Sequence, residues 1–241
     1  KEIKINLESL KLNLEKTKIL LDFIKKTHST GVIRVYGYMY QQVENKYVYY
    51  ELMEMADRDW ERELLIRQKY YKYYTEYELI IILNQLVKIL ALLQKHHITH
   101  RDVKPQNVLI SSGLFKLSDF GESRQLVRGG IICSRVRGTE LYMSPILFQG
   151  YHMKLPLVNH NTYKSDVFSL GMCMLFAATL TFDSLCDIRE LTNMVLIKDV
   201  ILRHLLGRYS FRVINILLEM LQVDENSRPD FILLEQKYFS N

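Results

Sequence analysis

Residues 100–121 of this 241-residue chain read HRDVKPQNVLISSGLFKLSDFG. This stretch contains several side chains that are suited to chemical catalysis. Short runs of β-forming residues alternate here with polar residues and with turn formers such as glycine and proline. This alternation predicts short strands that are joined by polar loops.

Four side chains of this stretch suit the transfer of a phosphoryl group from a triphosphate. Asp119 and Asn107 offer a carboxylate and an amide oxygen, which are hard ligands of the kind that a divalent cation prefers. Asp102 would orient an attacking hydroxyl and accept its proton, a contribution of typically ~10²–10⁴ in rate. Lys104 lies two residues further on, so an extended backbone places it on the same side as Asp102, where it would meet the charge of the transferring group.

Further motifs follow in order along the chain. GTELYMSP occupies residues 138–145, KSDVFSLG occupies 164–171, and SRP closes a helix-like run at 227–229. Together with residues 100–121, these motifs resemble those of the eukaryotic protein kinases of the Ser/Thr type. The resemblance extends over essentially residues 1–236.

The resemblance implies a two-lobed protein-kinase fold of the α+β class. Residues 1–241 would form one kinase domain with a truncated small N-lobe and a larger, mainly helical C-lobe. The partial N-lobe would comprise residues 1–56, with one helix, a sheet and the hinge, and the C-lobe would comprise residues 57–241.

The resemblance also implies roles for individual residues. Asp102 would be the catalytic base, Lys104 would contact the γ-phosphate of ATP, and Thr139 would lie with them at the catalytic centre. Asn107 and Asp119 would bind Mg²⁺ or Mn²⁺. The expected reaction transfers the γ-phosphate of ATP to Ser or Thr hydroxyls of a protein substrate.

The ATP pocket would be built largely from residues near the hinge. Met53 falls at the gatekeeper position, and Leu109 would form the floor of the adenine pocket. The backbones of Glu54 and Ala56, on either side of Met55, would bond the adenine. The other candidates in this pocket are Asp59 for the ribose hydroxyls, Lys1 as the phosphate-pairing lysine, and Glu15 as the helix partner of that lysine.

Two features depart from the family pattern. The chain contains no G-x-G-x-x-G loop to cover the phosphates, so we expect it to be a fragment that is weakly active or inactive by itself. Ile146 stands where the family usually has a Glu that pairs with the arginine matching Arg228. A buried and unpaired Arg would cost ~3–5 kcal/mol, so we expect Arg228 either to find another acceptor or to be exposed.

Arg101, which precedes the catalytic Asp102, indicates control by phosphorylation of the activation segment. The candidate site is Ser134, set among Arg128, Arg135 and Arg137, and an upstream kinase would be the partner that modifies it.

Composition limits the other possibilities. The formal net charge of +5 is compatible with an anionic ligand such as a nucleotide, but it is too weak to indicate nucleic acid. The three cysteines form no CxxC pair, which favours a reducing compartment, the cytoplasm or the nucleus. The apolar run Leu170–Leu180 is far shorter than the ~20 residues that cross a membrane, so it predicts a core helix and no membrane association.

Two alternative functions remain open. The chain could be a pseudokinase, a scaffold that binds partners without phosphoryl transfer. The run KYYKYY at residues 69–74 interleaves bases with aromatics, as in proteins that stack single-stranded RNA, although a solvated connector between helices is the simpler interpretation.

Hydrophobic periodicity predicts the main elements of secondary structure. Residues 121–164 show no such pattern and are expected to be a loop. The predicted elements are a helix at 7–27, a hairpin of 32–40 and 46–55 around the turn 41–45, and helices at 78–95, 170–180, 188–206 (one or two) and 211–221, the last capped by Ser210.

Overall fold

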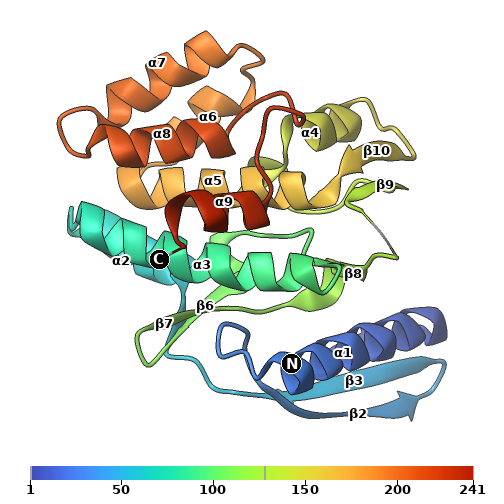
Figure 1. Cartoon of the computed structure of the whole chain (residues 1–241). Helices are drawn as coiled ribbons and strands as arrows, with labels where there is room; N and C mark the ends of the chain where they lie inside the picture. Colours follow the sequence, from blue (N-terminus) through green and yellow to red (C-terminus); the bar gives the residue numbers. More distant parts are fainter. Residues whose placement is uncertain (1, 128, 241) are drawn as a thin grey trace.

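The computed structural model of the chain describes residues 2–127 and 129–240. A small sheet and one long helix form one end of the molecule, and a larger, mainly helical part forms the other (Figure 1). This is the expected two-lobed α+β architecture. The chain passes from the small part to the large part through the segment that follows Met53.

The long helix of the small part is α1 (Leu7–Thr27), with the bounds that the sequence predicts. Asn6 caps its start, since its side chain accepts a hydrogen bond from the backbone N–H of Ser9 at 2.8 Å. His28 ends the helix in a left-handed conformation, with φ 52°. The buried face of α1 is formed by Leu10, Thr17, Leu20 and Phe23.

The sheet beside α1 has three antiparallel strands in the order β1-β3-β2. Their bounds are β1 (Glu2–Ile5), β2 (Val35–Val43) and β3 (Lys46–Met53). The predicted hairpin is confirmed, but its turn is only Glu44–Asn45, so the prediction of a longer turn at 41–45 was wrong. Gln41 and Gln42 continue the strand because the exposed end of a hairpin accepts polar side chains.

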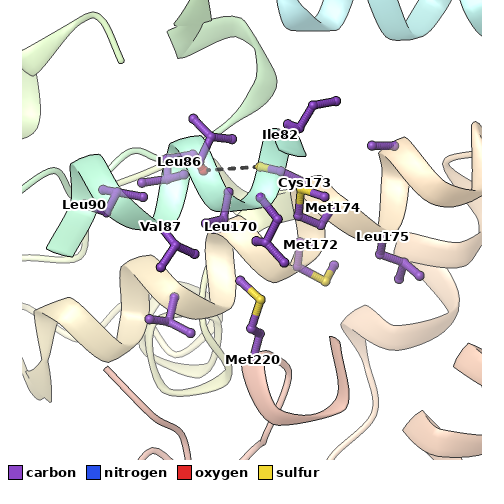
Figure 2. Close-up of a cluster of buried hydrophobic side chains, with 14 of the residues drawn as sticks. Ile82, Leu86, Val87, Leu90, Leu170, Met172, Cys173, Met174, Leu175 and Met220 are labelled. Carbon is purple, nitrogen blue, oxygen red and sulfur yellow. Dashed lines mark hydrogen bonds between the residues drawn. The ribbon is translucent and has the colours of Figure 1, made fainter. Parts of the chain in front are cut away.

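Two helices form the centre of the large part, α3 (Glu76–Lys95) and α5 (Thr162–Thr179). Figure 2 shows side chains of α3, such as Leu86, meeting those of α5, such as Leu170, with Met220 of α8 on the other side of α5. Cys173 lies in this core, with its Sγ 3.9 Å from the carbonyl oxygen of Val103. The prediction that the apolar run Leu170–Leu180 is a core helix is thus confirmed.

No helix in the described part of the chain is both long enough and apolar enough to span a membrane.

Further helices surround this centre. Ser210 caps α8 as predicted, because its Oγ accepts the backbone N–H of Arg212 at 3.2 Å. The predicted helical region 188–206 contains a break, after which Asn193 caps a new helix. The bounds are α2 (Trp60–Lys69), α6 (Asp183–Arg189), α7 (Met194–Leu205), α8 (Phe211–Met220) and α9 (Phe231–Tyr238).

The expected loop at 121–164 instead contains regular structure. Strand β9 (Ile131–Ser134) pairs antiparallel with β10 (Val158–Asn161), and helix α4 (Pro145–His152) lies between them in sequence. The two strands are far apart along the chain, so their pairing leaves no local pattern to read. Five further short strands pair in two small sheets. The first sheet contains β4 (Arg58–Asp59), β6 (Val108–Ser111) and β7 (Leu114–Leu117), and the second contains β5 (Ile98–Thr99) and β8 (Arg124–Gln125).

Candidate active site

A buried carboxylate on α5 holds the backbone of the loop that begins at Thr99. Asp166 accepts three hydrogen bonds, from the Thr99 hydroxyl at 2.8 Å and from the backbone N–H groups of His100 and Arg101 at 2.9 Å each. Burial raises the pKa of Asp166 in spite of these donors. Arg101 takes a left-handed backbone conformation, with φ 69°, immediately before Asp102.

The side chains predicted for the catalytic centre form one hydrogen-bonded cluster. Lys104 Nζ lies 3.0 Å from Asp102 Oδ2 and 2.7 Å from the Thr139 hydroxyl. The Thr139 hydroxyl also lies 3.0 Å from Asp102 Oδ1, and Asn107 Nδ2 donates to Asp102 Oδ2 at 2.9 Å. Gly138 makes this approach possible, because it has φ +107° and a Cβ there would lie 3.0 Å from the carbonyl oxygen of Arg101. The structure thus brings together four residues from two separate segments.

A cavity of about 250 Å³ lies between α1, the small sheet and this cluster. Met53 and Leu109, the predicted gatekeeper and floor, both line it. Asn107 and Asp119 line the same cavity, so the predicted adenine pocket and the predicted metal ligands share one space.

The hinge leaves backbone groups available for a flat heterocycle. Within the described residues, neither the carbonyl of Glu54 nor the N–H of Ala56 takes part in a hydrogen bond. The Glu54 carboxylate turns away to pair with Lys116 and with the Ser111 hydroxyl, and these partners hold its pKa below the usual value although burial alone would raise it. Met55 is 92% exposed.

Asn107 and Asp119 suit a hard divalent cation. Asn107 Nδ2 donates two hydrogen bonds to Asp102, one to its backbone carbonyl and one to its carboxylate. The amide oxygen of Asn107 is therefore the atom that can bind a cation. In residues 2–127 and 129–240, no group of three or more His, Cys, Asp or Glu side chains could hold a metal by itself. Two oxygen ligands that are completed by phosphate and water are the usual protein site for Mg²⁺.

The hinge residues Glu54, Met55 and Ala56 do not line this cavity, and three further predicted pocket residues are not placed in it either. Glu15 is exposed on α1 and does not line the cavity. Asp59 serves as the N-cap of α2, where its Oδ1 accepts the backbone N–H of Arg62 at 2.8 Å. Lys1 lies outside the described residues.

Sequence reasoning missed one acidic residue that contacts the catalytic loop. Glu61, in the first turn of α2, accepts a hydrogen bond from Gln106 Nε2 at 2.5 Å, and burial raises the pKa of Glu61. No sequence signal marked this contact, because Glu61 and Gln106 lie 45 residues apart in the chain.

The activation segment contacts Arg101 without any added phosphate. One guanidinium nitrogen of Arg101 donates to the Ser134 hydroxyl and to the carbonyl of Arg135, each at 3.1 Å. Ser134 itself is buried, at 6% exposure. Arg137 pairs instead with Glu122 at 3.4 Å, and Arg128 is outside the described residues.

Arg228 has hydrogen-bond acceptors in place of the glutamate that Ile146 replaces. This confirms the first of the two expectations, another acceptor or exposure to solvent. Arg228 is buried, and its guanidinium donates to the backbone carbonyls of Lys164, Gln222 and Val223. It also lies over the Phe168 ring, 4.9 Å from the ring centroid. Burial lowers the pKa of Arg228 to about 10. Ile146 meanwhile packs in a small apolar cluster with Met143, Leu147 and Val158.

The stability of this region is expected to depend on pH through His160 of β10. His160 is 2% exposed, and burial, together with the charge of Arg101, lowers its pKa to about 4. A lowered pKa means that protonation favours the unfolded chain, so its contribution is complete above pH 6.5 and is lost as the pH falls toward 4. The difference corresponds to about 3 kcal/mol, since one pKa unit is about 1.4 kcal/mol.

Urea unfolding at pH 7, 6 and 5 measures this loss. A His160→Gln variant keeps a polar side chain but cannot be protonated, so its free energy of unfolding should fall less steeply over the same range. Equal slopes for the two proteins would contradict the assignment to His160.

A model of the protein kinase domain family matches residues 4–239. The probable serine/threonine-protein kinase nek3 of Dictyostelium discoideum is 31% identical over 195 residues, which cover 75% of this chain and 16% of that protein. The dual specificity protein kinase zak2 of the same organism is 30% identical over 183 residues, covering 70% and 26%.

The mitogen-activated protein kinase kinase 1c of Physcomitrium patens is 38% identical over 133 residues, covering 54% of this chain and 35% of that protein. The matched segments thus span 16–35% of the length of these three relatives. The family match over residues 4–239 includes the cluster around Asp102 and the residues that line the cavity beside it. The chain belongs to the protein kinase domain family.

Proposed function

We propose that the chain is the catalytic domain of an ATP-dependent protein serine/threonine kinase. The observation that carries this proposal is the cluster of Asp102, Lys104 and Thr139, joined through Asn107 to the cavity that Asp119 lines. In this arrangement, Asp102 as the general base and Lys104 as the cation would lie beside the space where the phosphates of a nucleotide would end. Residues 1–56 and 57–241 would act as the two lobes on either side of that space.

The chain's own side chains supply most of the chemistry. Asp102 would accept the proton of the attacking hydroxyl, and Thr139 and Lys104 hold its carboxylate in one orientation. Lys104 would offset the negative charge of the transferred group. Mg²⁺, held by Asn107 and Asp119, would neutralise the phosphates of ATP when bound.

The substrate would be a Ser or Thr hydroxyl of a protein. Among the relatives named above, nek3 is called a probable serine/threonine-protein kinase, which supports this class, whereas zak2 is called a dual specificity protein kinase. The free cysteines Cys133, Cys173 and Cys186 support a reducing compartment such as the cytoplasm or the nucleus.

Regulation through Ser134 is the second part of the proposal. A phosphate on Ser134 would pair with Arg101, which already donates to its hydroxyl. Because Ser134 is buried in the pairing of β9 with β10, an upstream kinase would reach it only after these strands separate.

RNA binding is not part of this proposal, because the basic side chains near residues 69–74 have a simpler role. Lys69 lies in the last turn of α2, and Arg203 and His204 lie in the last turn of α7. Cations at the C-terminal end of a helix stabilise its dipole.

Phosphotransfer from Mg²⁺-ATP to a generic Ser/Thr protein substrate tests the function. The test uses the whole protein to which residues 1–241 belong, beside an Asp119→Asn variant and a matched Asp199→Asn variant on the exposed side of α7. We expect Asp119→Asn to raise the Mg²⁺ concentration for half-maximal rate at least roughly tenfold, as lost metal contacts do, while Asp199→Asn has no effect. No transfer by the unmodified protein, with its activation segment phosphorylated, would favour the scaffold alternative.

A further inference from the structure

Residues 139–145, which we call the substrate segment, connect the catalytic cluster with α4. The first residue of the segment, Thr139, forms hydrogen bonds with Asp102 and Lys104. A substrate hydroxyl at Asp102 would therefore lie beside Thr139, and the substrate residues next to that hydroxyl would lie near the segment. The position of this segment thus affects how a protein substrate presents its hydroxyl to the base.

A buried arginine at the end of α6 holds the backbone of the substrate segment. Nη1 of Arg189 donates to the carbonyl oxygen of Leu141 at 3.3 Å and to that of Met143 at 2.5 Å. Within residues 2–127 and 129–240, no other side chain forms a hydrogen bond with the backbone of this segment. Thr139 therefore fixes the segment at the catalytic cluster, and Arg189 fixes it two and four residues further on.

Stability alone does not explain an arginine at this position. Arg189 is 8% exposed, and in the described part of the chain no carboxylate forms an ion pair with it. The rings of Phe148 and Phe168 lie beside its guanidinium, with centroids at 4.2 and 5.5 Å. Burial lowers the pKa of Arg189 to about 10, so it stays charged at neutral pH. Its Nε is buried without a hydrogen-bond partner among the described residues, and leaving a buried donor unpaired is unfavourable.

The other buried arginine beside Phe168 does not hold the substrate segment. The guanidinium of Arg228 lies over the same ring, but its acceptors are carbonyls of other segments, those of Lys164, Gln222 and Val223. Ile146, which directly follows the substrate segment, has an aliphatic side chain that can pair with neither arginine. Of the two arginines, it is therefore Arg189 that joins the substrate segment to the helices of the large part.

We propose that Arg189 is a positioning residue for the protein substrate. By holding the carbonyls of Leu141 and Met143, it would keep the substrate segment where a bound Ser or Thr hydroxyl can reach Asp102. Arg189 does not line the cavity of Met53 and Leu109, so it would act on the protein substrate and not on the nucleotide. This proposal rests on the proposed function.

Steady-state kinetics with the whole protein to which residues 1–241 belong separates this role from a merely structural one. Arg189→Met removes the donor, Arg189→Lys keeps a charged donor, and Arg212→Met on the exposed face of α8 is the matched control. We expect Arg189→Met to lower kcat/KM for a protein substrate about 10²-fold, as small misplacements of a reacting group do, and to leave KM for Mg²⁺-ATP unchanged. Arg189→Lys should recover part of this loss, and Arg212→Met should change neither quantity.

Hydrogen exchange provides a second measurement that does not depend on catalysis. The amides of the substrate segment should exchange faster in Arg189→Met than in the unmodified protein, because the lost hydrogen bonds act locally. The amides of α3 should exchange at the same rate in both proteins.

Three outcomes would overturn the proposal. They are an unchanged kcat/KM for the protein substrate in Arg189→Met, unchanged exchange in the substrate segment, and a rise in KM for Mg²⁺-ATP that matches the loss for the protein substrate and comes with a lower melting temperature. Failure of the proposed function has a different signature. The unmodified protein, with its activation segment phosphorylated, would then transfer no phosphate to a protein substrate, and both proposals would fall together.

Discussion

An Asp102→Asn variant is expected to transfer phosphate about 10²–10⁴ times more slowly than the unmodified protein. Asparagine has the same shape and can still bond Thr139, but its amide cannot accept the proton of the substrate hydroxyl. It also removes the ionic partner of Lys104, which lies 3.0 Å from the carboxylate. The loss should appear in kcat, because Asp102 does not line the cavity of Met53 and Leu109.

Steady-state kinetics with Mg²⁺-ATP and a protein substrate would check this, with KM for ATP measured in parallel. Asp199→Asn again provides a control for the same chemical change on an exposed surface. A variant that keeps more than about a tenth of the rate would remove Asp102 from the role of base.

An Arg228→Met variant is expected to lower the free energy of unfolding by about 3 kcal/mol, because buried carbonyls lose their donor. Methionine fills part of the space and preserves the contact with Phe168, but it donates no hydrogen bond. The carbonyls of Lys164, Gln222 and Val223 would lose this donor inside the protein, and each unsatisfied buried group costs about 1–3 kcal/mol.

Urea unfolding of the variant, followed by circular dichroism, measures the effect. Arg212→Met on the exposed face of α8 is the matched control, and it should change stability by less than about 0.5 kcal/mol. A similarly small change for Arg228→Met would show that the three carbonyls find water, and that the guanidinium does not stabilise the link between α5 and the segment before α9.

Long periodic elements were predictable from the sequence, because their signal is local. Helix α1 has the bounds that its apolar spacing predicts, and α3 differs from its prediction only at the start, where Thr75 and Glu78 form a capping box. The strands β9 and β10 were not predictable in this way. They have four residues each, and each becomes a strand only by pairing with a partner far away in sequence.

The residues of the candidate site show the same difference between local signals, which the sequence reveals, and contacts between distant segments, which it does not. Asp102, Lys104 and Asn107 lie within one short loop, so their spacing alone indicated that they act together. The presence of Ile146 in place of a glutamate correctly predicted that Arg228 needs other acceptors. The acceptors of Arg228 are backbone carbonyls, which no sequence pattern marks. Glu15 was misplaced because a family position does not reveal which way a helix is turned about its axis.

The sequence by itself determined the family and the long helices α1 and α3, because each depends on residues that are close together in the chain. The tertiary structure decided that Glu51, and not Glu15, lines the cavity of Met53 and Leu109, and it decided which groups accept hydrogen bonds from Arg101 and Arg228. These outcomes depend on the rotation of α1 against β3 and on contacts between distant segments, such as Thr17 with Glu51. Packing of the whole core sets that rotation, and no single stretch of sequence encodes it.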